Sequence, residues 1–282
     1  MTCNYKISEK IGEGAFSEVF YAEHNASNFP VALKKLKIES LSEDEMKSCL
    51  NEILLLQKVN CENVICCFGG FKESNNYYIS LEYADAGDLE GLITMNRQNG
   101  RLFSERSIWF YFHQICAGVK ELHAKRILHR DLKPANIFLT SKGKAKIGDL
   151  GLSRIFSLKT QFAKSIVGTE YYLAPERNSQ GGYHFKSDIW SLGCILYELC
   201  ALRSPFNGEQ QNAYALFKRI ETCQFPPIPA NCYSRQLKYF ISSCLTVKPA
   251  NRPNAEQAHL AASLMNKKFE TLRLQYKKQF GK

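Results

Sequence analysis

The hydrophobic pattern of this chain changes from strand-like to helix-like near Asp88, and that change limits the fold more than any other feature. Before it, short apolar or alternating runs bounded by Gly and Asn predict strands at residues 5–11, 18–23, 31–37, 64–71 and 77–82. A capping box at Ser42–Glu45 opens one helix among these strands. After it, longer apolar runs predict helices at 108–122 and 188–202. The pattern predicts a small sheet lobe followed by a larger helical lobe.

Length and composition suit one large globular domain or two lobes. The chain has 282 residues, 45% apolar and 23% charged, so it can bury a core without disulfide staples. Its first residues lack an apolar signal region, and no apolar run approaches the ~20 residues that span a bilayer. The 11 cysteines are odd in number and scattered without metal-ligand spacing, which favours free thiols in a reducing cytosol or nucleus.

The formal net charge of +10 is concentrated at the end of the chain. The last eighteen residues hold six Lys and Arg against one Glu, so the remainder is only mildly basic and predicts no specific nucleic-acid partner. An apolar face made of Phe269, Leu272, Tyr276 and Phe280 predicts a helix in this segment. That helix either packs on the domain with a solvated basic face or docks to an acidic partner or a membrane surface.

The most specific chemistry lies in the run His-Arg-Asp-Leu-Lys-Pro-Ala-Asn at residues 129–136. Asp131 can orient an attacking hydroxyl or accept its proton, and Lys133 can neutralise a phosphate as charge moves to the leaving oxygen. Asn136 and the downstream Asp149 offer the neutral and anionic oxygens that suit a magnesium ion. This set suits one task, which is to hold a metal-bound triphosphate against a hydroxyl group.

Upstream residues supply what such a loop requires. Gly12 and Gly14 lie between two predicted strands, where glycines let backbone N–H groups approach phosphate oxygens, although a plain hairpin turn is the alternative for these two residues alone. Lys34 lies on the third predicted strand and Glu52 lies within the predicted helix. Each charge explains the other, because Lys34 would hold the α- and β-phosphates while Glu52 holds Lys34 in place.

Together these motifs resemble those of the eukaryotic protein kinases, from about Tyr5 to about Leu260. A Gly-rich loop, Val-Ala-Leu-Lys ending at Lys34, His-Arg-Asp, Asp-Leu-Gly, Ala-Pro-Glu at 174–176 and Ser-Asp-Ile-Trp at 187–190 follow the family's order. Lys133, two residues after Asp131, and Gly-Thr before Ala-Pro-Glu resemble the Ser/Thr class rather than the Tyr class.

The resemblance implies an α+β, bilobal protein-kinase fold. A small five-stranded antiparallel N-lobe with one helix would occupy residues 1–83, and a larger, mainly helical C-lobe residues 84–262. Residues 263–282 would form a basic amphipathic C-terminal tail. By the same resemblance Glu176 would pair with Arg252, and Asp188 would anchor the backbone of the loop that carries Asp131.

Finer details resemble the NIMA-related (Nek) kinases. Leu150 replaces the usual Phe, and residues 167–172 and 201–206 match that group's pattern, while 81–89 and 220–227 resemble its short subgroup, little more than a catalytic domain. This implies ATP and Mg²⁺ as cofactors and protein substrates with an apolar residue upstream of the modified Ser or Thr. It also implies cell-cycle, microtubule or ciliary signalling in the cytoplasm, on the cytoskeleton or in the nucleus.

The resemblance also assigns a nucleotide site. Leu81 would lie behind the adenine, and the backbone of Glu82 and Ala84 would bind its edge. Apolar side chains would sandwich the ring, namely Ile11, Val19, Ala32 and Phe138. A hydrophobic spine would consist of Leu56, Phe68, His129 and Leu150. His129 is expected to pack and to bond to backbone rather than to act as a base.

Residues 149–176 resemble the kinase activation segment. Ser165 lies four residues before Thr169, where relatives carry an activating phosphate. Arg130 and Arg154 would clamp that phosphate, which an upstream kinase would add, and the alternative for Ser165 is an unmodified loop serine. Thr169 itself would hydrogen-bond to the side chains of Asp131 and Lys133.

Two other functions compete with a protein Ser/Thr kinase. A pseudokinase scaffold would bind nucleotide and partners without efficient transfer, but it would normally lack one of Lys34, Asp131, Asn136 or Asp149, and all are present. A small-molecule kinase is disfavoured because Thr169 and the Ala-Pro-Glu region predict a shelf for a peptide.

Overall fold

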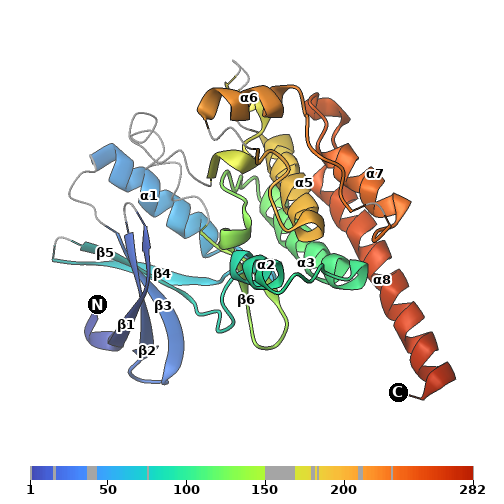
Figure 1. Cartoon of the computed structure of the whole chain (residues 1–282). Helices are drawn as coiled ribbons and strands as arrows, with labels where there is room; N and C mark the ends of the chain where they lie inside the picture. The colour runs from blue at the N-terminus through green and yellow to red at the C-terminus, as the bar shows by residue number, and fades with distance from the viewer. Residues whose placement is uncertain are drawn as a thin grey trace.

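A small sheet lobe and a larger helical lobe make up the fold (Figure 1). The computed structural model describes residues 2–14, 17–36, 43–74, 76–149, 169–178, 182, 184–208, 212–229 and 231–281. The matching element order confirms the predicted bilobal α+β kinase fold.

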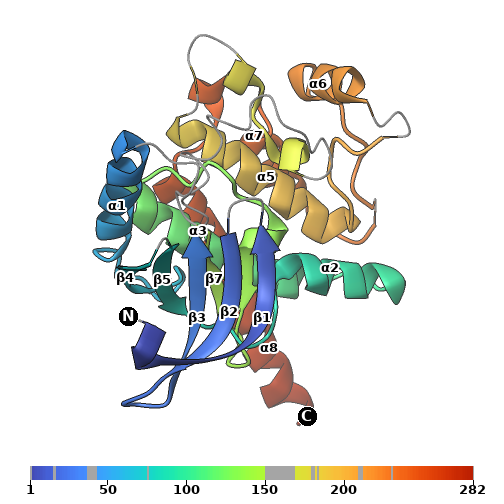
Figure 2. The ribbon, with the colours of Figure 1, turned by 90° about the vertical axis from the view of Figure 1, so that its left-hand side faces the viewer.

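The N-lobe is built on a five-stranded antiparallel sheet in the order β1-β2-β3-β5-β4 (Figure 2). Its strands are β1 Tyr5–Gly14, β2 Ser17–His24, β3 Phe29–Leu36, β4 Cys67–Glu73 and β5 Asn76–Glu82. The β1–β2 register runs from Tyr5 opposite His24 to Gly14 opposite Ser17, so both glycines of the predicted loop lie at the end of a hairpin. Helix α1, Glu43–Leu56, packs against β4, and Ser42 of the predicted capping box lies outside the described residues.

Strand β4 begins at Cys67, three residues later than predicted. Val64 instead forms an isolated parallel bridge with Ile147, and the Ile65 N–H donates to the Ile147 carbonyl at 2.8 Å. The apolar run is therefore divided between two lobes: its first part pairs with a C-lobe hairpin, and only its second part joins the N-lobe sheet. An apolar run alone cannot distinguish these two kinds of pairing.

The predicted hydrophobic spine is wrong at Phe68. Along β4 the side chains alternate between faces, and Cys67 is 5% exposed whereas Phe68 is 44% exposed. Phe68 lies on the outer face, where its ring meets Phe29 edge-on with centroids 5.7 Å apart. Cys67 therefore occupies the inward position beside Leu56, and Leu150, the last predicted spine residue, lies outside the described residues.

The C-lobe packs helices around one almost fully buried helix. Helix α5, Phe185–Ala201, packs against α3, Glu105–Ala124, and α7, Arg235–Cys244. The lobe also contains α2 Leu89–Gln98, α6 Ala213–Glu221, α8 Ala255–Phe280 and a hairpin of β6 Ile137–Leu139 with β7 Ala145–Ile147. Within the described ranges, no helix is long and apolar enough to cross a membrane.

Helix α8 runs without a break across residue 263, where the tail was expected to begin. The helical character predicted there is confirmed. Phe269 packs against the core, and Arg106 of α3 donates to Glu270 at 2.7 Å. Beyond Glu270 every described residue of α8 is exposed, and Figure 1 shows this end projecting from the C-lobe.

Candidate functional site

The carboxylate of Asp188, on the first turn of α5, anchors the loop that carries Asp131. Asp188 is completely buried, and its two oxygens accept the backbone N–H groups of His129 and Arg130, each at 3.1 Å. His123 of α3 adds a third contact, Nε2 to Oδ2 at 2.7 Å. Arg130 has φ 71°, a left-handed conformation uncommon for a residue with a side chain, and the Asp188 contact stabilises it. The predicted anchoring role is confirmed.

His129 is a structural residue, as predicted. Its ring is fully buried, Nε2 donates to the Gly148 carbonyl at 2.9 Å, and Nδ1 accepts the Asp131 N–H at 3.3 Å. In these two contacts Nε2 is the donor and Nδ1 the acceptor. They also link the Asp131 loop to the residue that precedes Asp149.

Two polar residues of the loop, Lys133 and Asn136, contact the Asp131 carboxylate. Lys133 contacts it at 2.9 Å, and the Asn136 amide nitrogen donates to Asp131 Oδ2 at 3.1 Å and to the Asp131 carbonyl at 2.7 Å. The side chains of Asp131 and Lys133 are 23% and 22% exposed, so both are accessible but held. The loop thus presents a fixed carboxylate beside a fixed ammonium.

Lys34 of β3 joins this site from the N-lobe. Its ammonium contacts Asp149 Oδ1 at 2.5 Å, and the Lys34 side chain is 9% exposed whereas that of Asp149 is 44% exposed. Burial raises the pKa of Asp149, but the Lys34 ammonium and other nearby positive charge, including that of Lys133, together bring the net pKa below its ordinary value. The Asp149 carboxylate is therefore ionised at neutral pH.

The donor set of Asn136 and Asp149 fits a magnesium ion. Contacts with Asp131 point the Asn136 amide nitrogen inward, so its oxygen points the other way. The backbone carbonyl of Asn136 accepts the Gly148 N–H at 2.9 Å, which fixes Asn136 relative to Asp149. One neutral and one anionic oxygen are ligands that Mg²⁺ uses together with water and phosphate.

The predicted nucleotide residues come from both lobes. In the sheet, Val19 lies opposite both Gly12 and Lys34, and Ala32 lies opposite Leu81. Ile11 is 42% exposed. From the C-lobe, Phe138 packs so closely that a Cβ at Gly148 would lie 2.5 Å from its ring, so only glycine fits there.

A pocket behind this region connects the sheet with the Asp149 segment. Its lining residues are Lys34, Ile53, Leu56, Ile65, Cys67, Ile79, Leu81, Gly148 and Asp149. The pocket therefore brings together Lys34, Leu81 and Asp149, three residues that the sequence assigned to one site. Burial raises the pKa of the Cys67 thiol to about 11, so this thiol is protonated at neutral pH.

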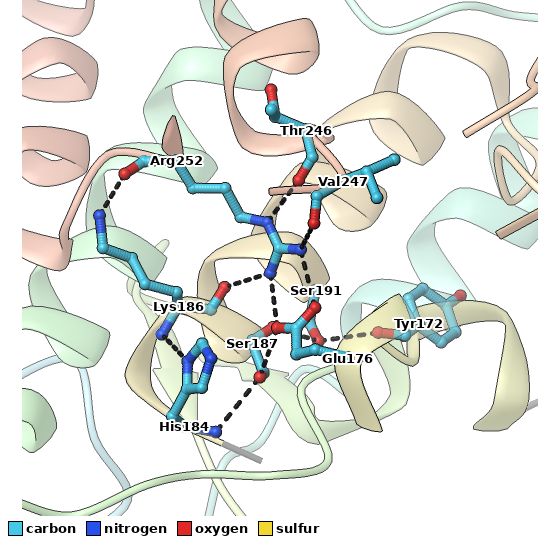
Figure 3. A network of polar contacts seen from close by, with 9 residues as sticks. All are labelled: Tyr172, Glu176, His184, Lys186, Ser187, Ser191, Thr246, Val247 and Arg252. Carbon is cyan, nitrogen blue, oxygen red and sulfur yellow. Dashed lines mark hydrogen bonds and ion pairs between the residues drawn. The ribbon is translucent and has the colours of Figure 1, made fainter. Parts of the chain in front are cut away.

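A buried arginine holds Glu176, at the end of the predicted activation segment (Figure 3). Both terminal nitrogens of Arg252 donate to Glu176, at 2.7 and 2.8 Å, and its guanidinium lies 4.9 Å from the Trp190 ring centroid. The remaining donors bind the carbonyls of Thr246, Val247 and Lys186. All five N–H groups are thus used, and the predicted Glu176–Arg252 pair is confirmed.

Helix α5 holds the same segment through hydroxyl groups and a buried acid. Ser187 donates to Glu176 at 2.7 Å, and Ser191 donates to the Tyr172 carbonyl at 2.9 Å. The Tyr172 hydroxyl donates to Glu198 at 2.5 Å. Burial raises the pKa of Glu198 to about 7, even though the Tyr172 bond lowers it. One helix therefore fixes both the Asp131 loop and residues 172–176.

Several predicted residues lie outside what the structure describes. Ser165 and Arg154 are among residues 150–168, and the side chains of Glu52 and Thr169 are likewise not described. The expected Lys34–Glu52 pair, the Thr169 contacts and the phosphate clamp therefore stay predictions.

Sequence reasoning missed two polar residues that support the site. His123 binds Asp188, and Lys146 of β7 binds Glu82 across 64 residues of sequence. Lys146 could have been noticed, because it stands between apolar Ala145 and Ile147, where a buried lysine needs anionic partners. His123 carries no such signal, since it lies at the end of an amphipathic helix.

Residues 5–262 match the protein kinase domain family, so the chain belongs to the protein kinase family. Its relatives include the Nek kinases, which confirms the NIMA-related resemblance. It is 39% identical over 251 residues to human serine/threonine-protein kinase Nek5 and 39% identical over 254 residues to mouse serine/threonine-protein kinase Nek3. These matches cover 89% of this chain but only 35% and 48% of the two relatives. A third relative, human serine/threonine-protein kinase Nek2, is 35% identical over 261 residues, 58% of its own length.

Replacing Arg252 by Lys should lower the free energy of unfolding by about 3–5 kcal/mol, because one ammonium cannot serve Glu176 and three carbonyls at once. Urea unfolding followed by circular dichroism measures the change. Arg273→Lys is the matched control: its pair with Glu270 is solvent-exposed, and the unfolding midpoint should hardly move. Equal midpoint shifts in the two variants would contradict the role assigned to Arg252.

Proposed function

We propose that this chain is a protein kinase that transfers the γ-phosphoryl group of ATP to Ser or Thr of protein substrates. The observation that carries the proposal is the convergence of Lys133 and Asn136 on Asp131, beside a Lys34–Asp149 pair that joins the two lobes. Phosphoryl transfer needs positioning and charge neutralisation more than covalent chemistry, and this cluster supplies both.

Each side chain has a distinct task in the proposed reaction. Asp131 orients the substrate hydroxyl and accepts its proton, and Lys133 stabilises the charge on the transferred group. Lys34 holds the α- and β-phosphates, with Glu52 as its partner, and Thr169 supports Asp131 and Lys133. The backbone of Glu82 and Ala84 binds the adenine edge.

Asn136 and Asp149 would hold Mg²⁺, which supplies positive charge to the phosphates when bound. The Lys34 ammonium helps to hold the pKa of Asp149 below its ordinary value, so the carboxylate is ionised and can bind a cation at neutral pH.

Regulation and partners follow the Nek resemblance. Phosphorylation of Ser165 by an upstream kinase would order the activation segment through Arg130 and Arg154. The exposed basic end of α8 would dock to an acidic partner or a membrane surface. The proposed setting is cell-cycle, microtubule or ciliary signalling, in the cytoplasm, on the cytoskeleton or in the nucleus.

Asp131→Asn should lower the rate of phosphate transfer by about 10²- to 10⁴-fold, because the amide cannot accept the hydroxyl proton. The assay is transfer of labelled γ-phosphate to a protein substrate, followed by identification of the phosphorylated residue. The variant should still be stabilised by Mg-ATP in a melting experiment. Glu270→Gln on α8, a carboxylate outside the site, should keep the wild-type rate.

A wild-type protein that is stabilised by Mg-ATP but transfers no phosphate would instead support the pseudokinase scaffold. Phosphate on Tyr alone would contradict the assigned substrate class.

Ser165→Ala should hold the kinase at low activity, since no phosphate could then bridge Arg130 and Arg154. The comparison requires protein first freed of phosphate and then treated with ATP and an activating kinase, with the rate measured before and after. Ser157→Ala, on the same segment, is the control and should still be activated. Equal activation of the Ser165 variant and the wild type would show that the regulatory phosphate is elsewhere.

A further inference from the structure

A buried lysine binds the interlobe segment, residues 82–87, to the β6–β7 hairpin of the C-lobe. Lys146 of β7 is 8% exposed, and its ammonium contacts the Glu82 carboxylate at 2.9 Å (Oε1) and 3.0 Å (Oε2). The ammonium also donates to the Glu62 carbonyl at 2.8 Å. It is thus held by one carboxylate and one backbone carbonyl. We refer to Lys146, Glu82 and the Glu62 carbonyl as the Lys146 clasp.

The Glu82 end of the clasp is fixed by its backbone as well as by its side chain. Glu82 Oε2 also accepts the Cys66 N–H at 3.1 Å, and the Glu82 N–H donates to the Cys66 carbonyl at 2.9 Å. The side chain and the main chain of Glu82 are therefore held by the same neighbour. Movement of this backbone would require several charged or buried hydrogen bonds to break together.

The Glu62 end of the clasp belongs to a loop that cannot move independently of the C-lobe. The Asn63 amide donates to the Ala145 carbonyl at 3.0 Å, and the Ile147 N–H donates to the Asn63 carbonyl at 2.9 Å. Helix α3 approaches so closely that a Cβ at Gly118 would lie 2.6 Å from the Asn63 oxygen. The loop is thus a fixed point against which Lys146 can hold Glu82.

The rest of the interlobe segment is bound along the same hairpin. Asp85 accepts the Ser141 N–H at 2.7 Å and its hydroxyl at 2.5 Å. The Leu139 N–H donates to the Gly87 carbonyl at 2.8 Å, and its own carbonyl accepts the Ala86 N–H at 3.0 Å. Figures 1 and 2 show this β6–β7 hairpin between the N-lobe sheet and the C-lobe helices. The hairpin also carries Phe138 and leads into Asp149.

We propose that Lys146 is a positioning residue for nucleotide binding, which fixes the backbone of residues 82–84 relative to Phe138 and Asp149. This inference rests on the proposed function, because the 82–84 backbone matters only if it binds the adenine edge. Lys146 itself has no role in phosphate transfer: its ammonium is consumed by Glu82 and Glu62. Its loss should therefore weaken ATP binding while leaving the chemical step largely intact.

The substitution Lys146→Met keeps the length and apolar stem of the side chain but removes the ammonium. The expected result is a KM for ATP raised about tenfold with kcat within about twofold of the wild type. Amide exchange at Cys66 and Glu82 should also become faster in the nucleotide-free protein, a readout that does not depend on activity. Lys146→Arg, which keeps a charged donor, should restore most of both properties.

Lys144→Met is the matched control. Lys144 is two residues away on the same hairpin and binds the carboxylate of the same Glu62 at 2.8 Å, but its side chain is 41% exposed. Its removal should change neither KM nor the exchange rates. The inference would be overturned if the Lys146→Met variant, shown by circular dichroism to be folded, kept the wild-type KM and exchange rates.

Other outcomes are also decisive. A fall in kcat with an unchanged KM would contradict a positioning role in nucleotide binding. A wild-type protein that neither binds nor uses Mg-ATP would overturn the proposed function, and this inference with it. If the wild-type protein transfers phosphate and Lys146→Met has no effect, the proposed function stands and only the positioning role of Lys146 is rejected.

Discussion

The arrangement of the site depends on one buried carboxylate, that of Asp188. An ionised group in a dry interior is destabilising unless it is fully hydrogen-bonded. Asp188 meets this requirement with two backbone N–H groups, from His129 and Arg130, and with the imidazole of His123. Meeting it fixes the loop backbone in a conformation that it would not adopt unaided, with Arg130 at positive φ. Asp131 is the next residue, so the position of its backbone is fixed by the same contacts.

Helix α5 extends this organisation to the segment on the other side of the site. Its surface is apolar except for a few polar residues, and each of these has a partner outside the helix. Asp188 holds the Asp131 loop, Ser187 reaches Glu176, and Ser191 and Glu198 reach Tyr172. Glu176 in turn pairs with Arg252, which lies between α7 and α8. A single rigid helix thus sets the relative position of two loops that are far apart in sequence.

The sequence predicted much of this because its motif residues stand at fixed spacings with mutually dependent charges. Asp188, Glu176 and Arg252 were assigned correctly through the resemblance to the protein kinases, and their burial explains why each of these charges has a partner. Local pattern failed where two environments look alike. Val64 and Phe68 belong to one apolar run, yet Val64 pairs with the C-lobe hairpin and Phe68 faces outward. Period-two alternation fixes a face only once the strand's first residue is known.

The contacts that link distant segments were the least predictable from sequence. Lys146 and Glu82 are 64 residues apart, and nothing in local spacing pairs them. Lys34 contacts Asp149, a partner 115 residues away that no local spacing indicates. Such pairs follow from how the lobes are packed, so they become visible only when the sheet and the β6–β7 hairpin are placed together.

The most direct test of the central claim is the steady-state kinetics of Asp188→Asn in the folded protein. The Asn oxygen can still accept one N–H group, but its NH₂ would face the other, so the loop should lose its geometry without losing the fold. We expect kcat to fall about 100-fold, because a catalytic group is then misplaced, while the Kd for Mg-ATP stays unchanged. A folded Asp188→Asn protein with the wild-type kcat would show that the loop's geometry does not depend on this carboxylate.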